Sequence, residues 1–397
     1  MNKSILLIVL ASACAAVWAG EQVNTIDART FDADGLTVTS GKVEFTAEGK
    51  KESLDRPDVS DLALAKAPDP MVKAGACVLR TVDGAQLVAV SITLSGTTLH
   101  CDNVLLGATD LPIEALKVIY MPDGKLTPQQ VQQRCQELKA DNGNEDILVV
   151  AKTDSDWTLV DGVFKGIDAE NVTFTLGDTD RAFPRKSIRA LYAAALSKKQ
   201  PQAGAGTILG VDGSSTPFAA MTMDAKTLAV DVAGLGKKTL NRADVAVVRF
   251  NSNRVVNLSD LKPTTVNEHG LLDQKFPYRV NASVDGKELK LGGQAFAAGL
   301  GMHSFCELTY ALDGAYGTFV AVAGIDDSVR PAGDATVTLL GDGKKLGESV
   351  RVTGKDKPVI VRAKIAGVKQ LMIRVEYGED KVDVSDHVDL VSARLIK

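Results

Sequence analysis

The run Lys369-Gln370-Leu371-Met372-Ile373-Arg374-Val375-Glu376-Tyr377 alternates in the way that a half-buried β-strand does. Leu371, Ile373 and Val375 fall on one face, and the charged residues between them fall on the other. Similar runs in the last third of the chain are separated by the tight-turn dipeptide Asp-Gly, at residues 285–286, 313–314 and 342–343. Residues 258–397 are therefore predicted to form one antiparallel β-sandwich domain.

Polar motifs lie beside these predicted strands. They are Pro277-Tyr278-Arg279, Gly299-Leu300-Gly301-Met302-His303-Ser304, Leu308-Thr309-Tyr310, Gly324-Ile325-Asp326-Asp327 and Ser385-Asp386-His387-Val388-Asp389. Taken in this order, they resemble the NPCBM family of carbohydrate-binding modules over nearly all of residues 258–397. The resemblance implies a galactose-binding-like jelly roll that holds sugars on loops at one end of the sandwich. It also implies an accessory role beside a glycosidase, and it does not imply catalysis.

The resemblance and the side-chain chemistry together give the candidate ligand-binding residues. We expect His303, which follows two glycines in a tight turn, to offer its imidazole to a sugar hydroxyl or a carboxylate. The acids of the motifs could ligate Ca²⁺, accept hydrogen bonds from sugar hydroxyls or cap loops, and a purely structural role for each stays open. We expect the motifs to meet near one edge of the sandwich. The candidates are His303, Asp326, Asp327, Asp386, His387, Asp389, Tyr278 and Arg279.

Composition limits the classes of function. The chain has 397 residues, enough for two to four domains, and its net charge of −5 argues against a nucleic-acid partner. Aromatic residues make up only 5% of the chain, which suits small β domains better than one large enzyme core. The sequence has no HExxH, GxSxG or P-loop motif. We therefore predict a protein that is not an enzyme.

The N-terminus predicts export. Lys3 precedes an apolar run from Ile5 to Val17, and small residues precede a cleavage point after Ala19. Residues 1–19 are therefore predicted to be a signal peptide, and a lipid anchor at Cys14 is the second interpretation. No later run approaches the ~20 apolar residues of a spanning helix, so the mature chain is predicted to be periplasmic or extracellular without a membrane span.

Export gives the cysteines of the mature chain two interpretations. Cys77 and Cys101 lie in one small β segment and form the favoured disulfide candidate. The alternative is that these residues, with Cys135 and Cys306, are free thiols in apolar cores. The absence of a CxxC spacing argues against a zinc site.

The residues before the sandwich contain a repeat. Four segments share one frame, in which an apolar residue is followed by two others at +5 and +8, and strand-like runs precede each frame. This layout predicts four small SH3-like or Sm-like barrels, either separate or fused in two pairs, over residues 20–126 and 143–257. Between the pairs, Thr127-Pro128-Gln129-Gln130 predicts a capped linker helix over 127–142. The frames are Leu54–Leu62, Leu111–Ile119, Phe183–Leu191 and Leu240–Val248.

Two hypotheses for function follow. The first is a secreted, non-catalytic carbohydrate-binding protein whose partner, by the family resemblance, is a galactose-containing glycan. It needs no cofactor, although a structural Ca²⁺ at the rim is compatible with it. The second is a structural or protein-interaction module of the cell envelope, whose jelly roll does not bind sugar.

Overall fold

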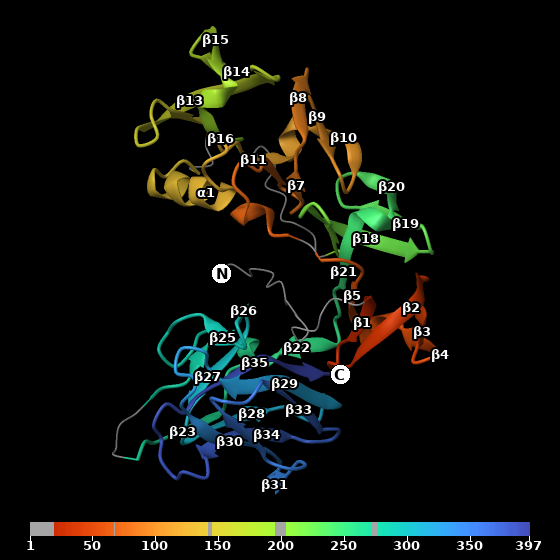
Figure 1. Cartoon of the computed structure of the whole chain (residues 1–397), viewed down its shortest axis with the longest axis vertical. Coiled ribbons are helices and arrows are strands. Elements are labelled where there is room, and N and C mark those ends of the chain that lie inside the picture. The colour runs from red at the N-terminus through yellow and green to blue at the C-terminus, as the bar shows by residue number, and fades with distance from the viewer. Residues whose placement is uncertain (1–19, 67, 142–144, 195–203, 272–275) are drawn as a thin grey trace. The chain divides into compact units, whose positions relative to one another are not determined.

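The computed structural model describes residues 20–66, 68–141, 145–194, 204–271 and 276–397. The predicted signal peptide, Cys14 and the predicted end of the helix at residues 142–143 lie outside these ranges. The chain is mostly β and divides into two compact units (Figure 1). The repeat unit comprises Gly20–Asn24 and Phe31–Asn251, and the sandwich unit comprises Thr25–Thr30 and Ser252–Lys397.

The repeat unit contains four segments with a similar order of elements, although the second segment has one strand more before its 3-10 helix than the other three have. Each begins with a series of antiparallel strands, continues with a short 3-10 helix (η) and ends with a closing strand. The first segment is β1 (Glu21–Thr25), β2 (Thr30–Val38), β3 (Lys42–Ala47), β4 (Lys50–Asp55), η1 (Arg56–Asp58) and β5 (Val59–Ala63). After η2 (Pro70–Val72), the second is β6 (Val78–Thr81), β7 (Gln86–Val88), β8 (Ser91–Ser95), β9 (Thr98–Asn103), β10 (Gly107–Pro112), η3 (Ile113–Ala115) and β11 (Leu116–Tyr120).

The third and fourth segments repeat the order of the first. The third is β12 (Asp146–Ala151), β13 (Trp157–Ile167), β14 (Asn171–Leu176), β15 (Thr179–Pro184), η4 (Arg185–Ser187) and β16 (Ile188–Tyr192). The fourth is β17 (Gly206–Gly210), β18 (Ser215–Met223), β19 (Thr227–Val232), β20 (Gly236–Asn241), η5 (Arg242–Asp244) and β21 (Val245–Phe250).

Closing strands join the segments in an order that differs from the chain order. Each closing strand pairs along one edge with the first strand of its own segment. Its other edge, which would otherwise be open, pairs with another closing strand: β21 with β5, and β11 with β16. The first segment is thus joined to the fourth and the second to the third, whereas the sequence analysis grouped the first two and the last two.

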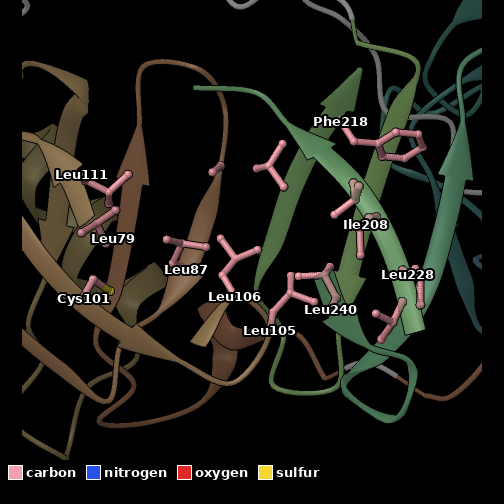
Figure 2. Close-up of a cluster of buried hydrophobic side chains, with 14 of the residues drawn as sticks. Leu79, Leu87, Cys101, Leu105, Leu106, Leu111, Ile208, Phe218, Leu228 and Leu240 are labelled. Atoms are coloured by element: carbon pink, nitrogen blue, oxygen red, sulfur yellow. The ribbon is translucent and has the colours of Figure 1, made fainter. Parts of the chain in front are cut away.

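One apolar core runs through all four segments. Figure 2 shows how the second segment takes part in it: Leu105 and Leu106, between β9 and β10, lie between Leu87 of their own segment and Ile208 of the fourth. Because these side chains are shared, the segments do not have separate cores. The repeat unit is one compact body.

The only α-helix in the described residues is α1 (Pro128–Glu137). It begins as predicted, because the Thr127 hydroxyl accepts from the Gln130 amide and the Gln130 side chain accepts from the Thr127 amide. It ends at Glu137, five residues before the predicted end, and Lys139 has a left-handed backbone with φ of 57°. Val131 and Cys135 are fully buried in a core shared with the sheet residues of β11 and β16, so α1 covers a sheet rather than linking two barrels.

The sandwich unit consists mainly of two antiparallel sheets. The first has the order β24 (Arg279–Val280), β27 (Gly299–His303), β35 (His387–Ile396), β29 (Thr318–Ile325) and β33 (Val359–Lys364), and β22 (Val255–Asn257) also pairs with β35. The second has the order β23 (Thr265–Glu268), β28 (Cys306–Ala311), β34 (Gln370–Tyr377), β30 (Asp334–Gly341) and β31 (Lys344–Lys345), and β32 (Val350–Thr353) pairs with β30. The hairpin β25 (Leu289–Leu291) and β26 (Gln294–Phe296) and the 3-10 helix η6 (Leu258–Asp260) complete the unit.

The local signals of the sandwich are confirmed. Leu371, Ile373 and Val375 on β34 are fully buried in the core between the two sheets. Asp342 and Gly343 join β30 to β31 with φ values of 49° and 78°, as a two-residue hairpin turn requires. Within the described residues, no helix has both the length and the apolar character needed to span a bilayer.

The cysteines differ from the favoured expectation. Cys77 and Cys101 are both free, as are Cys135 and Cys306, so the structure contains no Cys77–Cys101 disulfide. Burial raises the pKa of the Cys77 thiol to about 11 and that of Cys101 to about 12. Burial raises the pKa values of Cys135 and Cys306 as well, so all four are neutral free thiols, as in the alternative interpretation. Cys101 and Cys135 lie in apolar cores, whereas Cys77 contacts the Arg185 guanidinium and Cys306 donates to the Glu268 carboxylate.

Candidate functional site

The candidate motifs meet at one end of the first sheet of the sandwich. His303, the last residue of β27, lies opposite His387, the first residue of β35. His303 was expected in a turn, but the whole of Gly299–His303 is a buried strand. The glycines serve close approach instead, because a Cβ at Gly301 would lie 2.4 Å from the carbonyl oxygen of Ala282.

The rings of Phe276, His303 and His387 lie together at this end of the sheet, which we call the rim. The Phe276 ring stacks on His303 at a centroid distance of 4.0 Å, and the rings of His303 and His387 meet edge to face at 5.4 Å. Burial lowers the pKa of His303, and its Nδ1 lies 2.7 Å from the Ser304 carbonyl oxygen. His303 is therefore neutral at pH 7, and its Nδ1–H donates to that carbonyl. Its Nε2 is left as a hydrogen-bond acceptor.

His387 supplies an unpartnered polar group. Its Nδ1 is buried without a hydrogen bond, and the nearest carboxylate oxygen, Oδ2 of Asp285, is 3.8 Å away. The Asp285 side chain is 43% exposed, so it faces solvent at the rim. The hydroxyl of Ser283, two residues earlier, is also buried without a partner. Buried polar atoms are normally hydrogen-bonded, so each of these two unpartnered groups is available to a polar ligand.

Arg279 and Tyr278 make contacts that hold the backbone near this end of the sheet. The Arg279 Nε donates to the Val284 carbonyl at 2.7 Å, which holds the turn that carries Asp285. The Tyr278 amide donates to the Glu268 carboxylate, and the Tyr278 ring packs against the sandwich core. Both residues thus help to position the segment from Tyr278 to Asp285.

Asp326 and Asp389 form a buried pair of carboxyl groups. Both accept from the Lys290 amide, at 3.3 Å and 3.1 Å, and Asp326 also accepts from the Ser328 amide at 2.9 Å. Burial and the neighbouring Asp326 raise the pKa of Asp389 to about 9. Asp389 is therefore protonated at pH 7, and its proton can bridge to Asp326.

Asp327 and Asp386 are likewise engaged in the fold. The Asp327 carboxylate accepts from the amides of Gly292 and Gly293 at 2.9 Å and 2.6 Å, in the turn of the β25–β26 hairpin. Asp386 is fully buried; it accepts from the Ser304 hydroxyl and, at 2.8 Å, from the Asp334 amide. These bonds join the start of β35 to β30, so neither carboxylate is free for a ligand.

The predicted residues therefore have two different kinds of surroundings at the rim. His303 and His387 lie together as expected, whereas the four aspartates hold loops and hairpins in place. The sequence analysis missed Phe276, Ser283 and Asp285 as members of the site; the Asp285-Gly286 dipeptide indicated only a turn. In the described parts of the chain, no three or more His, Cys, Asp or Glu side chains are placed to hold a metal ion, so no such cluster supports the structural Ca²⁺ that the sequence left possible.

The described residues of 252–397 thus form a two-sheet β-sandwich with unpartnered polar groups at the end of one sheet. Residues 254–396 match the model of the NPCBM/NEW2 domain, and this part of the chain is an NPCBM/NEW2 domain. The match begins four residues before the predicted boundary at 258, because β22 pairs with β35 and belongs to the sandwich.

A curated relative and several solved structures are similar to parts of the chain. A Renibacterium salmoninarum protein named "Putative endo-alpha-N-acetylgalactosaminidase" is 34% identical over 94 residues, which is 24% of this chain and only 6% of the relative. The CBM51 of Clostridium perfringens GH95, solved with methyl-galactose, is 26% identical and is covered to 99%, over 36% of this chain, with a TM-score of 0.32. The tandem CBM51 modules of Sp3GH98 from Streptococcus pneumoniae are 11% identical, cover 94% of this chain and 87% of theirs, and have a TM-score of 0.31. At these TM-scores the assignment of the domain rests on its sequence match alone.

Proposed function

We propose that the chain is an exported, non-catalytic carbohydrate-binding protein, which binds a galactose-containing glycan at the rim of its NPCBM/NEW2 domain. The observation that carries this proposal is the unpartnered Nδ1 of His387 beside the exposed carboxylate of Asp285. A sugar hydroxyl can accept from the first group while it donates to the second. Phe276, stacked on His303, adds an apolar ring to the same rim, and such rings favour contact with the CH face of a pyranose.

The other features of the chain suit this role. The apolar run before Ala19 supports export to the periplasm or the extracellular space. We further propose that the four segments are SH3-like barrels that act as a scaffold; their shared order of strands, with a 3-10 helix before each closing strand, supports this. With one phenylalanine available to stack, we expect a dissociation constant on the order of 0.1–1 mM.

The test measures methyl-galactoside binding to the full chain by calorimetry. Asp285→Asn keeps an Asn-Gly turn, which is equally favourable, and should lower the affinity at least about tenfold through loss of the carboxylate acceptor. Asp313→Asn is the matched control, because it makes the same change in an exposed Asp-Gly turn of the same unit and should bind like the parent. Equal loss in both variants, or no loss in either, would contradict the proposed rim.

A second function has one observation in its favour. Leu271 and Val384, with exposed fractions of 50% and 66%, flank the same end of the chain's sandwich, where the Leu271 amide donates to Asp383 at 2.8 Å. Exposed apolar side chains of this size favour a protein partner in the cell envelope. If no galactoside, N-acetylglucosamine or other sugar on a glycan array binds the parent chain, this interaction role replaces sugar binding.

A further inference from the structure

We propose that the repeat unit binds a small amphipathic carboxylate in a pocket beside Arg56, where this arginine lacks the internal carboxylate that an equivalent arginine has. The pocket lies in a different unit from the sugar rim, and the proposal is independent of it. It rests on a comparison between segments of the same chain.

Arg56 and Arg242 occupy equivalent positions. Each is the first residue of the 3-10 helix of its segment, η1 and η5 respectively. Their segments are joined through the antiparallel pairing of β5 with β21. Each arginine therefore faces the partner segment in the same structural context.

Arg242 binds a carboxylate from the partner segment. Its Nη2 lies 2.6 Å from both carboxylate oxygens of Glu21, the first residue of β1. Its Nη1 donates to the carbonyls of Leu36 and Asp224, each at 2.7 Å. The guanidinium is thus held by a bidentate ion pair and two main-chain acceptors.

The third segment has a variant of this arrangement. Arg185, the first residue of η4, donates to the Asp168 carbonyl at 2.8 Å, as Arg242 does to Asp224. Its guanidinium meets the Cys77 thiol of the second segment, which immediately precedes β6. A polar side chain at the start of the partner's first strand thus meets the arginine in both cases.

Arg56 lacks this partner. The first residue of β17, which corresponds to Glu21 of β1, is Gly206, and the Phe218 ring lies 2.7 Å from where its Cβ would be. The Arg56 guanidinium is 5.1 Å from the ring centre of Phe250, and within the described residues it forms no ion pair. A permanently charged group is therefore held over a ring without an anion.

A cavity of about 670 Å³ opens beside Arg56. This volume suits one small ligand. Its walls are largely apolar, and Lys237 and Lys238 place two further cations on it against one acid, Asp231. The alanines at 219, 220 and 229 leave the wall formed by β18 and β19 open.

These features define the ligand as a carboxylate on an apolar body. The ligand carboxylate pairs with Arg56 from within the cavity, as the Glu21 carboxylate pairs with Arg242. The apolar body packs against Phe218, Met221 and Phe250, which are largely buried and line the cavity. The excess of cations also disfavours a cationic ligand.

The test compares octanoate with octanamide, two probes that differ only in the charged group. Both are titrated into the full chain by calorimetry up to about 10 mM, where weak binding is still measurable. We expect octanoate to bind at least about tenfold more tightly than octanamide, and Arg56→Gln to remove this preference. Lys51→Gln, an exposed lysine on β4 outside the pocket lining, is the control and should retain it.

A second variant distinguishes a loss of binding from a loss of folding. Ala220 is exposed on β18, so Ala220→Trp should fill the cavity, keep the melting temperature and abolish binding of octanoate. Octanoate that fails to bind the parent, or binds no better than octanamide, overturns the proposal. So does binding that survives both Arg56→Gln and Ala220→Trp.

Discussion

Replacing Asp389 by Asn should make the sandwich unit more resistant to alkaline pH. As two carboxylates, Asp389 and Asp326 would have acceptors only, and the buried Oδ1 of Asp389 has no donor. Burial disfavours the charged form of Asp389, and the adjacent Asp326 carboxylate can accept its proton, so the pKa of Asp389 is raised to about 9. An asparagine carries a permanent N–H donor and keeps an oxygen for the Lys290 amide, so it reproduces the protonated form at every pH.

The direction of this pH effect follows from the linkage between proton binding and folding. The pKa of Asp389 is raised in the folded state above its unfolded value of about 3.9, so folding retains a proton that the unfolded chain releases. The stabilisation is complete below pH ~4 and is lost as the pH rises through the folded pKa near 9. Each pH unit in this window removes about 1.4 kcal/mol, so the parent should lose about 4 kcal/mol between pH 5 and pH 8 relative to Asp389→Asn.

Scanning calorimetry of the full chain at pH 5, 6.5 and 8 measures this difference. The unfolding transition of the sandwich unit in Asp389→Asn should lie near that of the parent at pH 5 and well above it at pH 8. Asp380→Asn removes an exposed acid of the same unit and controls for net charge. Parallel pH profiles for the parent and Asp389→Asn would refute the shared proton.

Two further predictions concern the repeat unit. Leu116→Asp and Ile188→Asp place a charge at buried positions of the core that all four segments share, and should each cost at least about 3 kcal/mol and abolish cooperative melting of the whole unit; Lys117→Asp, exposed on β11, should not. If hydrogen exchange instead shows that only the mutated segment opens, the core is not continuous. Thr127→Ala removes the hydroxyl acceptor of the capping box and should cost about 1 kcal/mol, measured as faster amide exchange in the first turn of α1; unchanged exchange there would contradict the capping role.

Signals that act over a few residues were sufficient to predict many elements. Three examples are the Asp-Gly dipeptides, the alternation around Leu371 and the Thr127 capping box. Each depends only on interactions between residues that are close in the sequence. The closing strands at Leu116–Tyr120 and Ile188–Tyr192 lie where the repeat frame predicts them. Pairing between segments was not predictable in this way, since any open strand edge can pair with any other, and tertiary packing decides which pairs form.

The glycines around His303 show why a local signal can mislead. A Gly-x-Gly run is compatible with a tight turn and equally with a strand that another backbone crosses closely. Here Ala282 and Ser283 cross Gly301, and the strand is buried. The distinction depends on residues almost 20 positions away, so no reading of the run itself could have made it.

The acids of the rim likewise show that sequence motifs do not by themselves identify which side chains are free to contact a ligand. Asp386 and Asp285 are the same residue type, and only Asp386 belongs to a motif of the family resemblance. Yet Asp386 is fully buried with two protein donors, whereas Asp285 faces solvent beside an unpartnered histidine nitrogen. A carboxylate whose acceptors are occupied by its own fold gains nothing from a sugar, since binding would first have to break those bonds. The motif aspartates therefore shape the rim, and the proposed sugar binding is assigned to the side chains that the fold leaves unsatisfied, His387 and Asp285.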